Sequence, residues 1–392
     1  MGGRRPGAGG RPTRRHDAVT PMTRRLFALA AVPLVWFVGL VASAAPASAH
    51  SVSGVGATNW RTTVSSITPA TAGLTVRVVE NGSRLEVTNH GPEVVVLGYD
   101  AEPYLRIGPQ GVFINTRSPA AYLNCSRSGC SVPPIADSNA APKWERFSSG
   151  QTALWHDHRI HWMGNQLPPE VARAPGERHV QAQFTVTMLQ GPNRITVRGE
   201  YTWVPGPGPF PWLVLAAALA AVAVVVAVTR SWLVLAVATG VVVAVDLGHA
   251  VAVAWSWAGG PLFRVAQLFE GSSYQIPGWI LGALGVRLLW RGRARGRQAA
   301  ACAGASAVLF TGLLDFPVLS RSQAPFAGPI GLDRLCVAVC LGLGLGVALG
   351  ALALIRADRP RIEYADVDVD EGTPGELVAR LESNDASVVT AG

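Results

Sequence analysis

The sequence predicts a membrane protein in three parts: a signal peptide, an all-β extracytoplasmic sandwich of the immunoglobulin-like type, and an all-α polytopic membrane domain of about five helices. Three observations lead to this fold class. Of the 392 residues, 49% are hydrophobic and only 15% are charged, which is more apolar than a soluble domain. Residues Ser51 to Val204 alternate polar and apolar positions, as half-buried strands do. Residues Phe210 to Ile355 instead contain several apolar runs long enough to cross a membrane.

Residues 1–49 have the features of an export signal. Arg24 and Arg25 precede an uncharged run that ends in Ala47-Ser48-Ala49, the small-x-small pattern that signal peptidase accepts. Cleavage there makes His50 the first residue of the mature chain. Met22 would give a signal of ordinary length, and we expect it to be the true start. The alternative is an uncleaved anchor helix, because the apolar run is also long enough to span.

Residues 50–204 are predicted to form the β-domain. Asn81-Gly82, the strongest short hairpin signal, separates two alternating segments, and another strand follows the turn at Gly91-Pro92. Further strands are expected at Val112 to Asn115, Val180 to Leu189 and Arg194 to Val204. Short strands at this spacing indicate an antiparallel sandwich. Cys125 and Cys130 are predicted to form a disulfide, because an exported domain lies in an oxidising compartment.

The membrane domain is expected at residues 210–356, after a Pro/Gly linker at 205–209 that cannot continue a strand. The apolar runs predict spans at about 211–229, 232–255, 276–290, 299–319 and 334–355. With the β-domain outside, the basic connections Arg230, Arg287 to Arg297 and Arg356 to Arg361 lie inside, as the positive-inside rule requires. Glycines from Gly342 to Gly350 predict close helix packing. Residues 357–392 form an acidic tail that we expect to be cytoplasmic and disordered.

The segment "HDHRIHWM" is the candidate metal site of the β-domain. It supplies His156, His158, His161 and Met163, and imidazole and thioether groups are ligands that suit copper. In an extended segment His156 and His158 would face the same side, whereas a helical turn would bring His158 and His161 together. Zinc is the rival metal, because three histidines and one open position also describe a zinc site. The other alternative is a solvated surface loop whose tryptophans are anchored in the core.

His50 extends this metal hypothesis. A mature N-terminal histidine carries an α-amine and an imidazole that are both neutral near pH 8, so the two nitrogens can chelate one ion. This arrangement resembles the N-terminal histidine of lytic polysaccharide monooxygenases and of several exported bacterial copper-binding families, which are also β-sandwiches. The resemblance covers His50 and the domain type, and it implies copper as the cofactor. The membrane spans depart from the oxygenases, so their activity is not carried over. The bias toward Arg, Ala, Gly and Val resembles actinobacterial proteins of high GC content.

A second polar cluster is expected within the spans. Asp246 and His249 lie one turn apart on the second predicted span, and Asp315 lies in the fourth. Ionisable groups in a membrane are costly and usually face a cavity or a partner. Cys336 and Cys340, at i and i+4 on the fifth span, fall at the same depth, so a metal or proton path is one interpretation. The alternative is that the aspartates extend to water and the cysteines pack as small apolar residues.

These features favour a binding protein of the bacterial cell membrane, with its N-terminal domain outside and its C-terminus in the cytoplasm. The leading hypothesis is that the protein binds, delivers or senses copper. Its expected partners are the lipid bilayer and copper proteins or a membrane transport partner. The alternatives are a structural or interaction module without metal, and an accessory subunit of a transporter. The sequence has no nucleophile elbow, zincin helix or phosphate-binding glycine loop, so we do not expect an enzyme. Its positive charge lies mainly in the signal and the inner loops, so we do not expect nucleic-acid binding.

Overall fold

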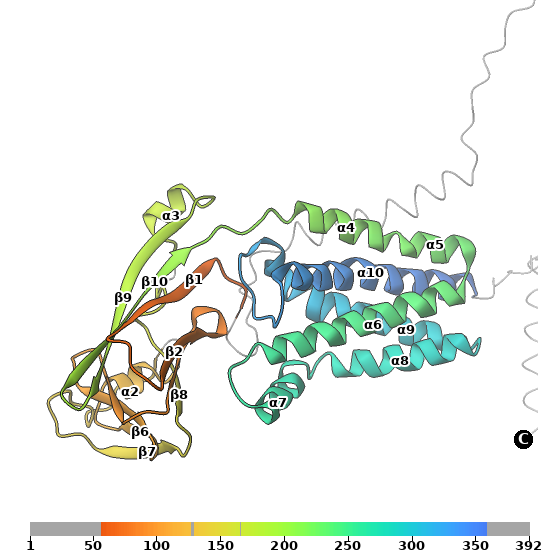
Figure 1. Ribbon diagram of the computed structural model, residues 1–392. Coiled ribbons are helices and arrows are strands. Elements are labelled where there is room, and N and C mark those ends of the chain that lie inside the picture. The colour runs from red at the N-terminus through yellow and green to blue at the C-terminus, as the bar shows by residue number, and fades with distance from the viewer. Residues whose placement is uncertain (1–55, 127–128, 165, 359–392) are drawn as a thin grey trace, which may run out of the picture. The chain divides into compact units, whose positions relative to one another are not determined.

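The N-terminal region of the computed structural model is an antiparallel β-domain, followed by a helical region (Figure 1). The structure describes residues 56–126, 129–164 and 166–358. The predicted signal peptide, His50 and nearly all of the acidic tail lie outside the described residues. The described residues up to Ile355 belong to one compact unit.

Ten strands form two antiparallel sheets. The larger sheet has the order β1-β10-β9-β4-β5-β6-β7, and the smaller one has the order β2-β3-β8. The strands are β1 (Trp60–Thr68), β2 (Leu74–Val79), β3 (Arg84–Asn89), β4 (Val94–Leu97), β5 (Pro103–Gly108), β6 (Gly111–Asn115), β7 (Trp144–Ser148), β8 (Thr152–His156), β9 (His179–Gln190) and β10 (Asn193–Trp203). Two short helices, α2 (Ala120–Leu123) and α3 (Pro169–Arg173), lie in the connections. The strands that the sequence predicted are therefore confirmed, while β1, β5, β7 and β8 were not foreseen.

Alternating side chains from both sheets build one apolar core. Leu85 and Val87 of β3 are fully buried in it, as are Ile107 of β5 and Val186 of β9. Because successive side chains of a strand point to opposite faces, this core explains the polar-apolar alternation of the sequence. The antiparallel β-region is confirmed, and its immunoglobulin-like connectivity stays a prediction.

Local turn chemistry sets the register of the first hairpin. Val79 of β2 is paired with Arg84 of β3, and Glu80 (φ 52°), Asn81 (φ 54°) and Gly82 (φ 87°) between them have left-handed backbone. Asparagine and glycine adopt this conformation at the least cost, so the predicted hairpin is confirmed. The predicted disulfide between Cys125 and Cys130 is also present, after α2.

The helical region contains more breaks than the sequence suggested. Its helices are α4 (Phe210–Ala220), α5 (Val222–Thr229), α6 (Trp232–Trp255), α7 (Pro261–Gly271), α8 (Ile276–Trp290), α9 (Arg295–Ala307) and α10 (Ile330–Ala357). Among the described residues, three helical segments are long and apolar enough to cross a membrane: 210–229, Trp232–Trp255 and Ile330–Ala357. The length and composition of these segments are those of a multi-pass membrane protein.

The third and fourth of the five predicted spans are helical but do not reach that length as single helices. The third is α8, with 15 residues. The fourth begins as α9, continues through a π-helical turn at Val308–Leu313, and ends in a 3-10 turn at Phe316–Ser320. Pro317, which cannot donate a backbone hydrogen bond, follows the break.

Glycines let the helices approach at backbone distance. A Cβ atom on Gly342 of α10 would lie 2.1 Å from the carbonyl oxygen of Ala216 in α4. On Gly304 of α9 it would lie 2.5 Å from the carbonyl oxygen of Gly344 in α10. The predicted close packing along the glycines of the last span is therefore confirmed.

One loop of the helical region is hydrogen-bonded to the residues just before β1 of the β-domain. The amide of Thr58 donates to the carbonyl of Gln323 at 2.9 Å, and the amide of Gln323 donates back to Thr58 at 3.0 Å. The amide of Ser322 also donates to the side-chain oxygen of Asn59 at 2.8 Å. These bonds fix the segment that connects the broken fourth helix to α10.

Candidate functional site

The His-rich segment forms a tight turn after β8, built around a buried aspartate. Asp157 is fully buried, and its carboxylate accepts hydrogen bonds from the indole of Trp155 (3.0 Å) and the backbone amide of Arg159 (3.0 Å). The guanidinium of Arg159 adds two more, through Nε at 2.8 Å and Nη2 at 2.7 Å. A buried carboxylate with this many donors is satisfied, so Asp157 and Arg159 hold the turn in place.

A phenol connects this turn to the neighbouring loops. The hydroxyl of Tyr99 accepts from the backbone amide of His158 at 3.0 Å and donates to the side-chain oxygen of Asn124. Burial raises the pKa of Tyr99 to about 12, so the phenol keeps its proton and can donate. Burial opposes the charge on Arg159, but its hydrogen bonds to Asp157 and the carboxylate charge raise the pKa of the guanidinium overall.

The turn separates the predicted metal ligands. His156 ends β8, where its Nδ1 lies 3.1 Å from the hydroxyl of Ser83, and it lines one cavity of the β-domain. His161 lines a different cavity of about 230 Å³. The rings of His158 and His161 are adjacent, with centroids 5.8 Å apart. His158 and His161 are thus neighbours, as the helical alternative expected, but they are brought together by a non-helical turn in which the amide of Ile160 donates to the carbonyl of Asp157. His156 and His158 do not share a strand face.

These positions leave the predicted copper site incomplete within the structure. Met163 is exposed, and His50 lies outside the described residues. Among residues 56–126, 129–164 and 166–358, no group of three His, Cys, Asp or Glu side chains is arranged to hold a metal ion. Neither copper nor zinc is supported by the described histidines alone.

The helical region contains the second predicted cluster, and its side chains do converge. His249 of α6 and Asp333 of α10 are both buried, and Nε2 of the imidazole lies 2.9 Å from Oδ1 of the carboxylate. Asp333 was not among the predicted site residues. It lies one residue before the apolar run of the last span and one turn before Cys336, and that spacing was the available signal.

Asp246 lies one turn earlier on α6 and is held by neutral donors. Its carboxylate accepts from the indole of Trp279 in α8 at 2.8 Å and from the hydroxyl of Thr311 in the π-helical turn. The side-chain amide of Gln275 donates in turn to that hydroxyl at 3.0 Å. The thiol of Cys340 lies 3.9 Å from the same carboxylate. Donors from α8, α10 and the broken fourth helix thus meet at one buried acid.

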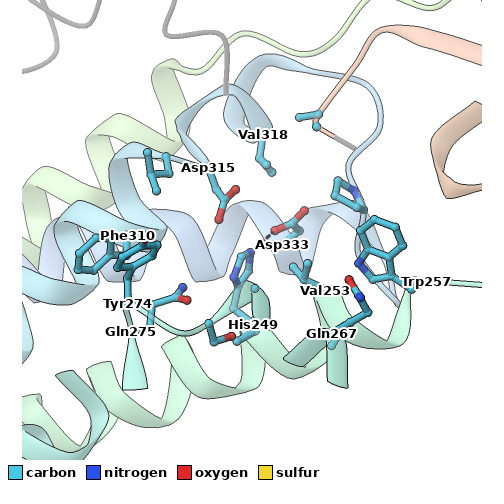
Figure 2. Close-up of a pocket in the computed structure, with 18 of the residues that line it drawn as sticks. His249, Val253, Trp257, Gln267, Tyr274, Gln275, Phe310, Asp315, Val318 and Asp333 are labelled. Carbon is cyan, nitrogen blue, oxygen red and sulfur yellow. Dashed lines mark hydrogen bonds and ion pairs between the residues drawn. The ribbon is translucent and has the colours of Figure 1, made fainter. Parts of the chain in front are cut away.

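A cavity of about 140 Å³ adjoins this cluster (Figure 2). His249, Asp315 and Asp333 line it, together with Gln267, Tyr274 and Gln275. Figure 2 shows the carboxylate of Asp315 turned toward the pair formed by His249 and Asp333. A cavity of this size has room for ordered water beside these carboxylates.

The two cysteines of α10 contribute apolar volume and one weak donor. Cys336 and Cys340 are both free thiols and buried. Cys340 contacts Asp246, whereas no hydrogen bond or ion pair to another side chain is present for the Cys336 thiol among the described residues. The prediction that the cysteines lie at the depth of the acids is consistent with these positions.

Four titratable side chains lie close together in the cluster. These are the imidazole of His249 and the carboxylic acids of Asp246, Asp315 and Asp333, and Nε2 of His249 lies 2.9 Å from Oδ1 of Asp333. No protein-family model, curated protein or solved structure matches this chain.

Proposed function

We propose that this chain is a multi-pass protein of the bacterial cell membrane whose helical domain binds and releases a proton, as an accessory component of a transport partner. The observation that carries the proposal is the convergence of His249, Asp315 and Asp333 on one cavity inside apolar helices. Burying ionisable groups in a membrane domain is costly, so their presence favours a functional role over packing.

Charge supports an orientation with the β-domain outside. The connection at Arg230, the connection at 291–294 and the end of α10 lie at the same end of the helical domain (Figure 1). These are the arginine-rich connections, and the positive-inside rule assigns that end to the cytoplasm. The polar cluster then lies toward the outer half of the membrane.

A proton fits the site better than a metal ion. Asp246 already accepts from Trp279 and Thr311, and the imidazole of His249 is already paired with Asp333. A metal would have to displace these bonds, whereas a proton is exchanged along them. Five predicted spans are few for an independent transporter, so we assign the chain to an accessory role.

Infrared difference spectroscopy tests this function on the full-length chain in nanodiscs. Lowering the pH from about 8 to about 5 should produce the band of a protonated, buried carboxylic acid. Asp315→Asn or Asp333→Asn should remove or shift that band. Asp100→Asn, at an exposed position of the β-domain, should leave it unchanged.

An unchanged difference spectrum in these variants would contradict the proposal. If neither membrane aspartate changes the difference spectrum, the cluster does not titrate and the proton-binding function is wrong. A structural or interaction module of the envelope would then be the better assignment for the chain.

Copper binding is the second candidate function, supported by one observation in the β-domain. The rings of His158 and His161 are adjacent. His161 lines the same cavity as Gly56 and Ala57, the first residues that the structure describes. His50 is six residues before Gly56, and an extended segment of that length reaches about 20 Å. A mature N-terminus is therefore long enough to bring its amine and imidazole to these rings.

Calorimetric titration of the full-length chain with copper and with zinc tests this candidate, after mass spectrometry has identified the mature N-terminus. One ion should bind per chain, and His158→Ala with His161→Ala should weaken binding at least about tenfold, because loss of the hydrogen-bond partners of a metal ligand alone already costs about that much. His90→Ala serves as the control, since that side chain is bonded to Gln151 at 2.7 Å. Tight binding that survives loss of His50, His158 and His161 would exclude the site.

A further inference from the structure

The helix α7 (Pro261–Gly271) connects α6 to α8 and contains no buried residue. Its apolar side chains are exposed instead: Leu262 at 87%, Phe269 at 61% and Val265 at 39%. These three positions are i, i+7 and i+3, so they share one face of the helix. A soluble protein would turn such a face toward its core.

The polar face of α7 is turned toward the protein. Arg264 and Gln267, three residues apart, are both partly buried. Nε of Arg264 donates to the backbone carbonyl of Trp257 at 3.2 Å, and Gln267 lines the cavity that contains His249. The helix is therefore inverted relative to a helix on a water-soluble domain.

The surroundings of this apolar face are those of a membrane boundary. α7 follows the end of the membrane-spanning helix α6, at Trp255, and precedes α8 (Figure 1). Trp255 is 39% exposed and Tyr274 is 66% exposed, on either side of α7. Tryptophan and tyrosine are enriched where spans enter the headgroup region. The candidate membrane-spanning helix α6 also exposes apolar side chains, Val241 among them.

We infer that α7 is an interfacial helix that lies in the plane of the membrane, with Leu262, Val265 and Phe269 among the lipid acyl chains and Gln267 toward the proton-binding cavity. Interfacial helices bury an apolar face a few ångströms below the headgroups and keep polar groups on the other face. Here that other face contacts the protein, so α7 forms a wall between the lipid and the cavity.

Photo-crosslinking tests the inference on the full-length chain in nanodiscs of phosphatidylethanolamine and phosphatidylglycerol. Leu262 and Phe269 are replaced, one at a time, by p-benzoylphenylalanine, and adducts are identified by mass spectrometry. Val241 in α6 is the positive control for lipid contact. Phe147 in β7 is the negative control. Its exposure of 66% is close to the 61% of Phe269, but it lies in the β-domain.

Both α7 positions should form lipid adducts in a yield similar to that at Val241, and Phe147 should form none. An adduct with a second copy of the chain would identify a protein interface and overturn the inference. No lipid adduct at either α7 position, while Val241 gives one, would also overturn it. If Val241 also forms no lipid adduct, the result contradicts the membrane-spanning assignment of α6. The Val241 control thus separates the position of α7 from the position of α6.

Discussion

Asp157→Ala should destabilise the β-domain by about 3 to 5 kcal/mol, the cost of removing one partner from a buried ion pair. The carboxylate is fully buried and accepts from Trp155 and three times from Arg159. Without it, the indole and the guanidinium lose their acceptor while the Arg159 side chain stays only 19% exposed. Chemical denaturation of the full-length chain, followed by its β-sheet circular dichroism, measures the change.

Two further variants separate charge from packing at this turn. Asp157→Asn keeps an acceptor oxygen and should cost less than the alanine change. Adding Arg159→Met to Asp157→Ala should recover part of the loss, because it removes the unpaired cation. An effect of Asp157→Ala within about 0.5 kcal/mol, typical of surface positions, would show that the turn does not stabilise the domain.

His249→Ala should destabilise the helical domain by about 3 kcal/mol, the lower end of the range for a broken buried pair. Asp333 is 1% exposed, and His249 is the side chain that lies within hydrogen-bonding distance of its carboxylate. The loss is at the lower end because the adjoining cavity of about 140 Å³ can admit water to the carboxylate. Thermal unfolding of the full-length chain in nanodiscs, followed by helical circular dichroism, gives the change.

The matched control at this position is His249→Gln, whose amide can still donate to Asp333. It should retain most of the stability but should not retain an imidazole that titrates. If the alanine and glutamine variants unfold at the same temperature as the parent chain, the pair contributes nothing to folding, and the buried histidine is kept for another reason.

Local and compositional signals predicted most of the architecture. The hairpin at Asn81-Gly82 follows from backbone preferences that act within four residues. The apolar runs of α6 and α10 are long enough to identify spans without any tertiary information. The fourth predicted span was harder to define, because its break near Pro317 depends on contacts of a π-helical turn that no hydropathy pattern reports.

The sites were predicted less completely, because they depend on contacts between distant segments. Three histidines within six residues suggested one metal site, but Asp157 folds the segment into a turn that places His156 and His161 at different cavities. The membrane cluster was found from its costly charges, yet Asp333 lies just outside the apolar run and was missed. α7 was missed because an 11-residue helix with mixed polarity resembles an ordinary loop in a hydropathy scan.

Because of the π-helical turn at Val308–Leu313, the number of residues in the fourth predicted span determines which of its side chains reach the polar cluster. A π-helical turn contains one more residue than the α-helical turn it replaces. Every side chain after it is therefore rotated by about 100° from its α-helical direction. Thr311 meets Asp246 within this turn, and Asp315 reaches the cavity just after it. Deletion of a single residue here would leave the composition and hydropathy almost unchanged, but it would rotate Asp315 off the cavity. We therefore expect selection against insertions and deletions in this short segment to be far stronger than selection against substitutions at its exposed positions. Leu309 and Leu314 are two such positions.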